Sequence, residues 1–351
     1  MRVRGLGRVK SIGRKWRNRL SPGGLILLYH RVAELESDPQ QLQVSASNFA
    51  AHLRTIKEIA TPIPLTELVS NLRSGKVTSR SVVVTFDDGA ADNLLAAKPL
   101  LEREDVPATI FVSTGYMKMA REYWWDEVER LILQPGDLPS TLILTINSQV
   151  HKWDLTPQTN YSRADYEAHS NWHATRTDEP TLRHQLYRAL INVLYPLEPD
   201  ERFQQLDYLK QWAADVTLSR DTHRPLTAEE VKQLAASGHI EIGAHTVSHS
   251  MLAALPASQQ RLEIEQSKAD LEEILGSPVR SFAYPFGTLS DYTSETVSLV
   301  RQLGFDCACS NFKDLVQPGD DLFQLPRLIV RDWTAEEFAN RVASWFKGEM
   351  I

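Results

Sequence analysis

Short apolar runs rich in β-branched residues alternate along this chain with amphipathic stretches that have helix-capping residues at their ends. The apolar runs span residues 25–30, 81–86, 108–113, 239–244, 280–285, 305–310 and 325–330. This strand-helix-strand repetition predicts an α/β fold with a mainly parallel sheet, and about seven units favour a barrel over a small open sheet. In such folds the chemically active side chains lie at the carboxyl ends of the strands.

The alternation is interrupted between residues 117 and 226. This stretch holds five of the eight tryptophans, a candidate hairpin over 141–155 and two helical segments near 182–194 and 200–214. We interpret it as an α+β insertion on one strand-to-helix loop of a catalytic domain that spans residues 21–351. Trp124 and Trp125 are candidates for stacking on a sugar ring, although a tryptophan in an inserted subdomain more often serves packing.

The first 20 residues form a basic tail with eight Lys or Arg and no acidic residue. The net charge of −7 therefore leaves −15 for the remainder, which argues against nucleic acid as a partner. Apolar residues in this tail recur three and four positions apart, so it either lies on an anionic membrane surface as a helix or remains a solvated tail. Because it lacks the apolar core of a signal peptide, we expect a cytoplasmic protein, with peripheral contact at the inner membrane face if the helix forms.

Two histidines follow the fourth apolar run in the sequence GAHTVSHS. His245 and His249 are four residues apart, so on a helical turn both rings project from one face and can bind the same metal ion. Position 246 is Thr, where a zinc protease of the H-E-x-x-H type has its glutamate. The pair therefore predicts a metal site of another kind, which needs a third ligand.

The sequence VVVTFDDGAADN places two adjacent carboxylates, Asp87 and Asp88, at the end of the second run. A carboxylate from a neighbouring strand would complete a two-histidine, one-carboxylate site with open positions, as catalytic metals have. Adjacent residues that leave a strand point in different directions, so one aspartate can bind metal while the other accepts a proton from water. Capping of the following helix is an alternative role for one of them.

The motifs TFDDG, HTVSH and FAYPFG, in this order, resemble the first three motifs of the polysaccharide deacetylases of carbohydrate esterase family 4, the NodB-homology domain. The resemblance covers residues 81–116 and 227 to about 330, together with the opening LLYH. It implies an irregular (β/α) barrel and metal-dependent removal of acetyl groups from N-acetylated, sometimes O-acetylated, sugars. Zinc is the expected metal, and such a site also accepts cobalt, nickel or iron.

The resemblance also assigns roles to individual residues. Asp88 would bind the metal with the two histidines, Asp87 would be the general base, and the backbone N–H of Phe286 would stabilise the oxyanion. Tyr284, in the same motif as Phe286, is a candidate contact for the sugar.

Two positions depart from the family pattern. Ala283 occupies the place of an arginine that orients the base, and Arg327 occupies the place of a histidine that acts as general acid. His30 offers a replacement, because the related poly-N-acetylglucosamine deacetylases open with a Tyr-His strand whose histidine serves as acid. Arg327 could then hold Asp87. The alternatives are a core histidine bonded to backbone at position 30 and an ordinary surface ion pair at position 327.

The expected function is hydrolysis of an acetyl group, most readily N-acetyl, from an amino sugar within a glycan or a lipid- or nucleotide-linked precursor. A non-catalytic glycan-binding member of the same fold is the main alternative, prompted by Ala283 and Arg327. A non-haem iron oxygenase would share the two-histidine, one-carboxylate set, but it leaves the FAYPFG loop and the second aspartate unexplained.

Overall fold

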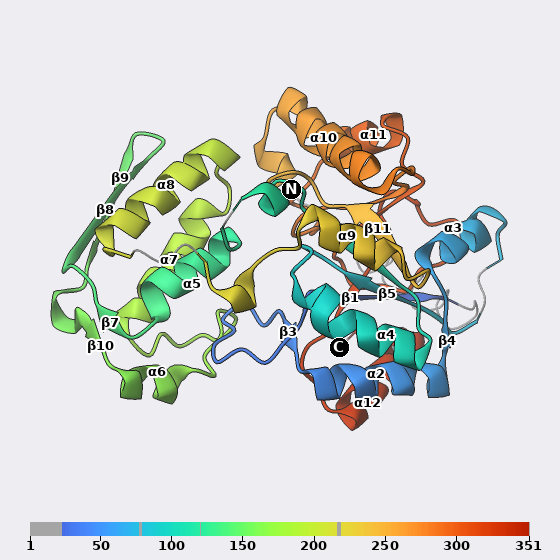
Figure 1. Ribbon diagram of the computed structural model, residues 1–351, viewed down its shortest axis with the longest axis horizontal. Helices are drawn as coiled ribbons and strands as arrows, with labels where there is room; N and C mark the ends of the chain where they lie inside the picture. The colour runs from blue at the N-terminus through green and yellow to red at the C-terminus, as the bar shows by residue number, and fades with distance from the viewer. Residues whose placement is uncertain (1–22, 77–78, 120, 216–218, 351) are drawn as a thin grey trace, which may run out of the picture.

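A single parallel sheet forms the centre of the computed structural model, which describes residues 23–350 except 77–78, 120 and 216–218. Seven strands follow each other in the order β13-β12-β11-β6-β5-β1-β14, and β4 pairs with β5 off this path (Figure 1). Their bounds are β1 (Leu25–Tyr29), β4 (Thr61–Pro62), β5 (Ser81–Phe86), β6 (Ala108–Val112), β11 (Ile240–Ala244), β12 (Ser281–Ala283), β13 (Cys307–Cys309) and β14 (Leu328–Ile329). Each of the seven lies within one of the predicted apolar runs.

The sheet curls until its two ends meet. An isolated parallel bridge joins Cys309 of β13 to Leu325, three residues before β14, while β14 pairs with β1. The backbone N–H of Ser310 also donates to the carbonyl of Leu325 at 2.8 Å. The predicted irregular (β/α) barrel is therefore confirmed.

Helices surround the outside of the barrel (Figure 1). They are α2 (Ala46–Ile59), α3 (Leu65–Arg73), α4 (Lys98–Glu104), α9 (Ala228–Ala235), α10 (Ala257–Leu275), α11 (Ser294–Gln302) and α12 (Ala335–Phe346). Capping boxes begin α9 at Thr227 and α12 at Thr334, as their Thr-x-x-Glu spacing predicts. Within the described residues, no helix is both long and apolar enough to cross a membrane.

Side chains alternate between the two faces of each strand, as the two-residue repeat of a strand requires. Val82, Val84 and Phe86 of β5 belong to the large core beneath the outer helices, whereas Val83 belongs to a smaller core with Phe111. That smaller core also includes apolar residues of α3. The inward-facing positions of β5 are therefore Val83 and Thr85, and Asp87 is the next position on the same side.

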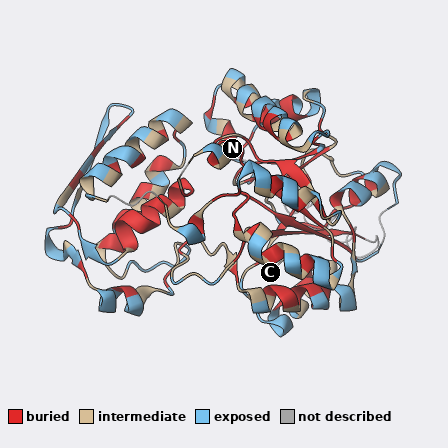
Figure 2. Ribbon diagram, in the orientation of Figure 1, coloured by how far each residue is buried: buried red, intermediate tan, exposed pale blue. Residues whose placement is uncertain are grey.

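The segment between β6 and α9 forms a second body of structure with its own buried side chains, most densely on α5 (Figure 2). It contains α5 (Trp124–Leu133), β7 (Gly136–Asp137), β8 (Thr141–Ile146), β9 (Gln149–Asp154), β10 (Asn160–Tyr161), α6 (Arg163–His169), α7 (Leu182–Leu194) and α8 (Pro199–Trp212). The β8–β9 hairpin and helices α7 and α8 occur where the sequence predicts them. The basic tail, residues 1–20, lies outside the described residues.

Gly243 in the middle of the sheet supplies a test of this packing. A Cβ atom at this position would overlap the ring of Phe111 and lie 2.7 Å from Ser281 Oγ. Because both neighbours are held in the barrel, we expect Gly243→Ala to lower the free energy of unfolding by about 3 kcal/mol, measured by urea denaturation.

Gly238→Ala is the matched control for that substitution. Position 238 has a φ of +72° but no atom within 4 Å of the added Cβ, so only the backbone cost of roughly 1–2 kcal/mol applies. If Gly243→Ala costs no more than the control, the close approach of Phe111 does not constrain this strand.

Candidate active site

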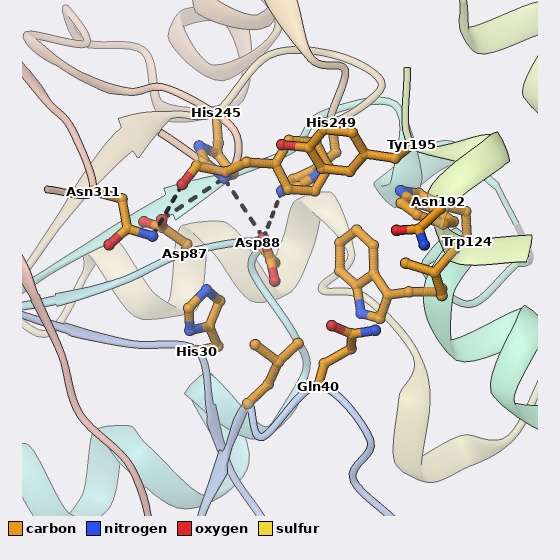
Figure 3. A pocket seen from close by; sticks show the side chains of 14 residues that line it. His30, Gln40, Asp87, Asp88, Trp124, Asn192, Tyr195, His245, His249 and Asn311 are labelled. Atoms are coloured by element: carbon orange, nitrogen blue, oxygen red, sulfur yellow. Dashed lines mark hydrogen bonds and ion pairs between the residues drawn. The ribbon is translucent and has the colours of Figure 1, made fainter. Parts of the chain in front are cut away.

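The motif residues come together at the carboxyl end of the barrel. Asp87 and Asp88 follow β5, His245 follows β11, and His30 follows β1. They line a pocket of about 360 Å³ between the barrel and the insertion (Figure 3). The lining residues are His30, Gln40, Leu42, Asp87, Asp88, Trp124, Trp125, Ile191, Asn192, Tyr195, His245, His249, Phe286 and Asn311.

Asp88, His245 and His249 form a buried cluster that could hold a metal ion, with one ligand atom of each lying within 4.8 Å of the others. Asp88 Oδ1 is 3.1 Å from His249 Nε2 and 3.6 Å from His245 Nε2 (Figure 3). Apart from these contacts within the cluster, neither Asp88 Oδ1 nor His245 Nε2 has a hydrogen-bond partner among the described residues. Buried polar atoms are rarely left in this condition, and a divalent cation is the group that fits a carboxylate oxygen and imidazole nitrogens.

Each of the two imidazoles has a neighbour or an environment that favours metal binding. His245 Nδ1 lies 2.8 Å from the carbonyl oxygen of Ala283, so it donates its proton there and leaves Nε2 free to act as a ligand. Burial lowers the pKa of His249, although the Asp88 carboxylate opposes this effect. The neutral imidazole is the form that coordinates a metal.

The loops that carry these residues have an unusual backbone. Asp88, Thr246, His249 and Phe286 all have positive φ values, of 72°, 65°, 52° and 60°. The left-handed region is costly for residues other than glycine and persists only where the surroundings enforce it. At Asp88 the carbonyl accepts a hydrogen bond from Ser113 N–H at 3.1 Å and another from the Tyr123 hydroxyl. Strained backbone at this density is typical of a functional site.

Asp87 is held by Arg327 inside the barrel. The guanidinium donates to both carboxylate oxygens, at 2.6 and 2.7 Å, and its Nε donates to the Ser310 carbonyl at 2.9 Å. Arg327 is 1% exposed and Asp87 is 4% exposed, so this is not the surface ion pair considered above. Burial by itself would raise the pKa of Asp87, but the charge of Arg327 and its hydrogen bonds outweigh this effect and keep the pKa below its ordinary value.

His30 lies half-buried on the pocket wall rather than in the core, across from the two aspartates (Figure 3). Its backbone carbonyl accepts a hydrogen bond from Asn93 Nδ2 at 2.9 Å, which fixes the end of β1. Burial lowers the pKa of its imidazole, and the charges of Asp88 and Asp87 oppose that shift. The ring is thus available to a molecule in the pocket.

The three aromatic residues proposed as sugar contacts have different positions. Trp124 and Trp125 do line the pocket, and the Trp125 ring meets the His249 ring edge-on, with centroids 4.8 Å apart. Tyr284 does not line the pocket. It is fully buried in the large core, stacked on Tyr292 at 4.1 Å, and its hydroxyl donates to the carbonyl of Phe323. The expectation that Tyr284 contacts the sugar is therefore wrong, because the strand alternation that turns Ala283 inward turns Tyr284 outward.

Sequence reasoning missed several residues of the pocket wall. Gln40, Leu42, Ile191, Asn192, Tyr195 and Asn311 line it. Tyr195, at the end of α7, packs its ring against Phe286 with centroids 4.3 Å apart and donates its hydroxyl to Asp291 at 2.6 Å. Only Asn311 carried a usable signal, because it follows a predicted strand directly; the residues of α7 look like ordinary helix positions.

Comparison with known proteins identifies the family of this chain. The family model for polysaccharide deacetylases matches residues 74–189 and 203–308, so the chain belongs to the polysaccharide deacetylase family. The resemblance drawn from the three motifs is confirmed. Members of this family are carbohydrate deacetylases, which are hydrolases that act on carbon-nitrogen bonds.

Individual relatives are more distant. YxkH of Bacillus subtilis (strain 168), a protein named for the same family, is 32% identical over 89 residues, which are 25% of this chain and 30% of that protein. Among solved structures, IcaB from Ammonifex degensii matches with a TM-score of 0.56 and 18% identity, over 93% of this chain and 98% of that one. The Streptococcus pyogenes deacetylase PplD, solved with acetate, matches with a TM-score of 0.52 and 16% identity, over 91% and 98%. At these identities the solved structures show a shared fold.

The Asp87–Arg327 pair predicts how stability depends on pH. The pKa of Asp87 is lower in the folded state than in the unfolded state. The contribution of this carboxylate to stability is therefore fully present above its unfolded-state pKa of about 3.9, and it is lost as the pH falls through its folded-state pKa. We expect Arg327→Met to lower the free energy of unfolding by about 3–5 kcal/mol at pH 7. This difference from the wild type should shrink as the pH falls, because burial raises the pKa of the unpaired Asp87 in the variant and protonation removes its charge. Urea denaturation between pH 3 and 7 measures it.

Arg183→Met is the control for this pH series. Arg183 is equally buried but donates to backbone carbonyls of Ile132, Gly136 and Thr159, which do not titrate. Its cost should stay constant over the same range. A constant cost for Arg327→Met as well would contradict the assignment of a charged Asp87.

Proposed function

We propose that this protein removes acetyl groups, in the first place N-acetyl groups, from an amino sugar within a glycan or its lipid- or nucleotide-linked precursor. One observation carries this proposal. The metal-ligand cluster of Asp88 and two histidines adjoins a second carboxylate, Asp87, and a buried arginine orients that second carboxylate. A binding module needs neither a second carboxylate nor its orientation. Zinc is the proposed metal, because two imidazoles and one carboxylate form a common catalytic zinc set.

Each group has a defined task in hydrolysis. A divalent cation held by Asp88, His245 and His249 would polarise the acetyl carbonyl as a Lewis acid and lower the pKa of water. Asp87 is ionised and fixed by Arg327, so it accepts the proton of the attacking water. The proton that the leaving amine requires comes from His30, on the other side of the pocket (Figure 3).

The composition of the pocket favours an uncharged sugar. Three side-chain amides, on Gln40, Asn192 and Asn311, line it together with the rings of Trp124 and Phe286. Amides pair with hydroxyl and acetamido groups, and aromatic rings pack on the apolar face of a sugar. Within the described part of the chain no Lys or Arg lines this pocket, so any phosphate of a linked precursor would lie outside it.

Asp87→Asn tests the proposed base. We expect the rate of acetate release from metal-loaded protein to fall at least ~100-fold, because the amide cannot accept the proton, while Zn²⁺ binding persists. The substrates are N-acetylglucosamine oligomers, acetylated polymers, and lipid- and nucleotide-linked acetylated sugars.

Asp92→Asn is the matched control, since Asp92 is also paired with a buried arginine, Arg31, but does not line the pocket. It should retain acetate release. If wild-type protein with bound metal releases no acetate from any of these substrates yet binds acetylated sugars, the glycan-binding alternative replaces the hydrolase.

His30→Gln tests the proposed acid. We expect kcat for N-acetyl substrates to fall about 100-fold with little change in stability, because the ring lies at the pocket wall and supports no core packing. His52→Gln is the contrasting variant, because His52 is fully buried between the Tyr29 hydroxyl and the carbonyl of Trp333. It should lose stability and keep turnover. If His30→Gln keeps full turnover, His30 is not the general acid and another residue supplies the proton.

A further inference from the structure

The turn from Thr246 to Ser250 joins the two histidines of the metal-ligand cluster. Thr246 and His249 both have left-handed backbone, and the His249 N–H donates a hydrogen bond to Thr246 Oγ1 across the turn, at 3.1 Å. Such a conformation stays in place only when surrounding groups enforce it. Two charged side chains from outside the sequence motifs do so.

Glu263 of α10 binds the turn from one side. Its Oε2 accepts hydrogen bonds from the backbone N–H groups of Val247 and Ser248, both at 2.9 Å, and its Oε1 accepts from Ser248 Oγ at 2.7 Å. Three charge-assisted hydrogen bonds to one carboxylate fix the backbone immediately before His249.

Arg202 of α8, in the insertion, binds the last two residues of the turn. It is 1% exposed, and its guanidinium donates to Ser250 Oγ at 3.0 Å and to the carbonyl of His249 at 3.5 Å. Its direct hydrogen-bond acceptors are neutral. Burial lowers the pKa of Arg202, and the charge of Glu263 opposes this shift. Burial of an arginine without a paired carboxylate lowers the stability of a fold. We therefore look for a function of Arg202 that offsets this cost.

Two serines connect the charged groups. Ser248 Oγ and Ser250 Oγ are 2.7 Å apart, so a continuous series of hydrogen bonds runs from Arg202 through both serines to Glu263. The guanidinium of Arg202 also lies over the ring of Trp124, 5.4 Å from its centroid, and Trp124 lines the pocket. The insertion thus reaches both the pocket wall and the backbone of a metal ligand through one side chain.

We propose that Arg202 of α8 and Glu263 of α10 are positioning residues that set the geometry of His249, and that the insertion thereby controls metal affinity. This inference rests on the proposed function, because it takes Asp88, His245 and His249 to be the metal ligands. The two residues touch neither substrate nor metal. They act through the turn, as partners that orient a metal ligand commonly do.

The first measurement is the dissociation constant for Zn²⁺, by competition with a chromophoric chelator, on the full chain. We expect Arg202→Met and Glu263→Gln each to weaken Zn²⁺ binding about 10–100-fold, as loss of a partner that orients a ligand does. Arg202→Lys should recover part of the affinity, because an ammonium group can still donate to Ser250. The visible spectrum of the Co²⁺-loaded protein should change in the same variants, which reports ligand geometry independently of turnover.

Two matched variants separate positioning from general destabilisation. Arg183→Met removes an equally buried arginine of the insertion that does not contact the turn, and Glu272→Gln removes a carboxylate of α10 that accepts the Val279 N–H instead. Both should lose stability in urea denaturation while Zn²⁺ affinity remains within about twofold of wild type. If Arg202→Met does not fold, Ser250→Ala breaks the same series with a smaller cost, and a measurable loss of affinity is expected there too.

The possible failures are distinguishable. The positioning role is overturned if Glu263→Gln keeps the wild-type affinity for Zn²⁺ and Arg202→Met, or Ser250→Ala in its place, keeps it too. That result would leave the metal site itself intact. Equal losses in the Arg183 and Glu272 controls also overturn it. Absence of Zn²⁺ and Co²⁺ binding by wild-type protein contradicts the metal site itself and therefore the proposed function.

Discussion

The buried ion pair between Arg327 and Asp87 organises this protein. Removing two charges from water is expensive, and the bidentate geometry with a third hydrogen bond to Ser310 is what offsets that cost. The three groups come from the end of β5, the end of β13 and the approach to β14, which are the places where the barrel closes. One guanidinium therefore joins the edges of the sheet and orients a carboxylate within the pocket.

This pair also explains how two adjacent aspartates can both stay ionised while buried. Asp87 continues the inward-facing side of β5 and meets Arg327, whereas the left-handed backbone at Asp88 turns its carboxylate toward the histidines. Burial would raise the pKa of Asp88, but its contacts with His245 and His249 hold the pKa well below the ordinary value. The two carboxylates thus have separate partners, the Arg327 guanidinium for Asp87 and the two imidazoles for Asp88. The cation that the cluster could hold would further offset their mutual repulsion.

Local sequence patterns predicted the barrel because its strands are continuous apolar runs and several helices begin with capping boxes. The site was predictable as far as its residues directly follow strands, as Asp87, Asp88 and His245 do. Tyr284 shows the limit of that reasoning. The alternation of side chains along β12 continues past Ala283, so Tyr284 points away from the pocket although it belongs to the same motif as Phe286. Arg202 and Tyr195 lie on helices with unremarkable patterns, and only the folded chain shows that they reach the pocket and the turn beside it.

The ring contact between Tyr195 and Phe286 has a consequence for how such proteins diversify. The apolar part of the pocket wall belongs to the hydrophobic core of the insertion, and Leu42 and Phe286, from outside the insertion, pack against that core. The Tyr195–Asp291 hydrogen bond adds a second link between the insertion and the Phe286 loop. The insertion, the loop over residues 286–291 and the segment around Gln40 thus share one pocket wall. We therefore expect these three segments to change together when substrate preference changes.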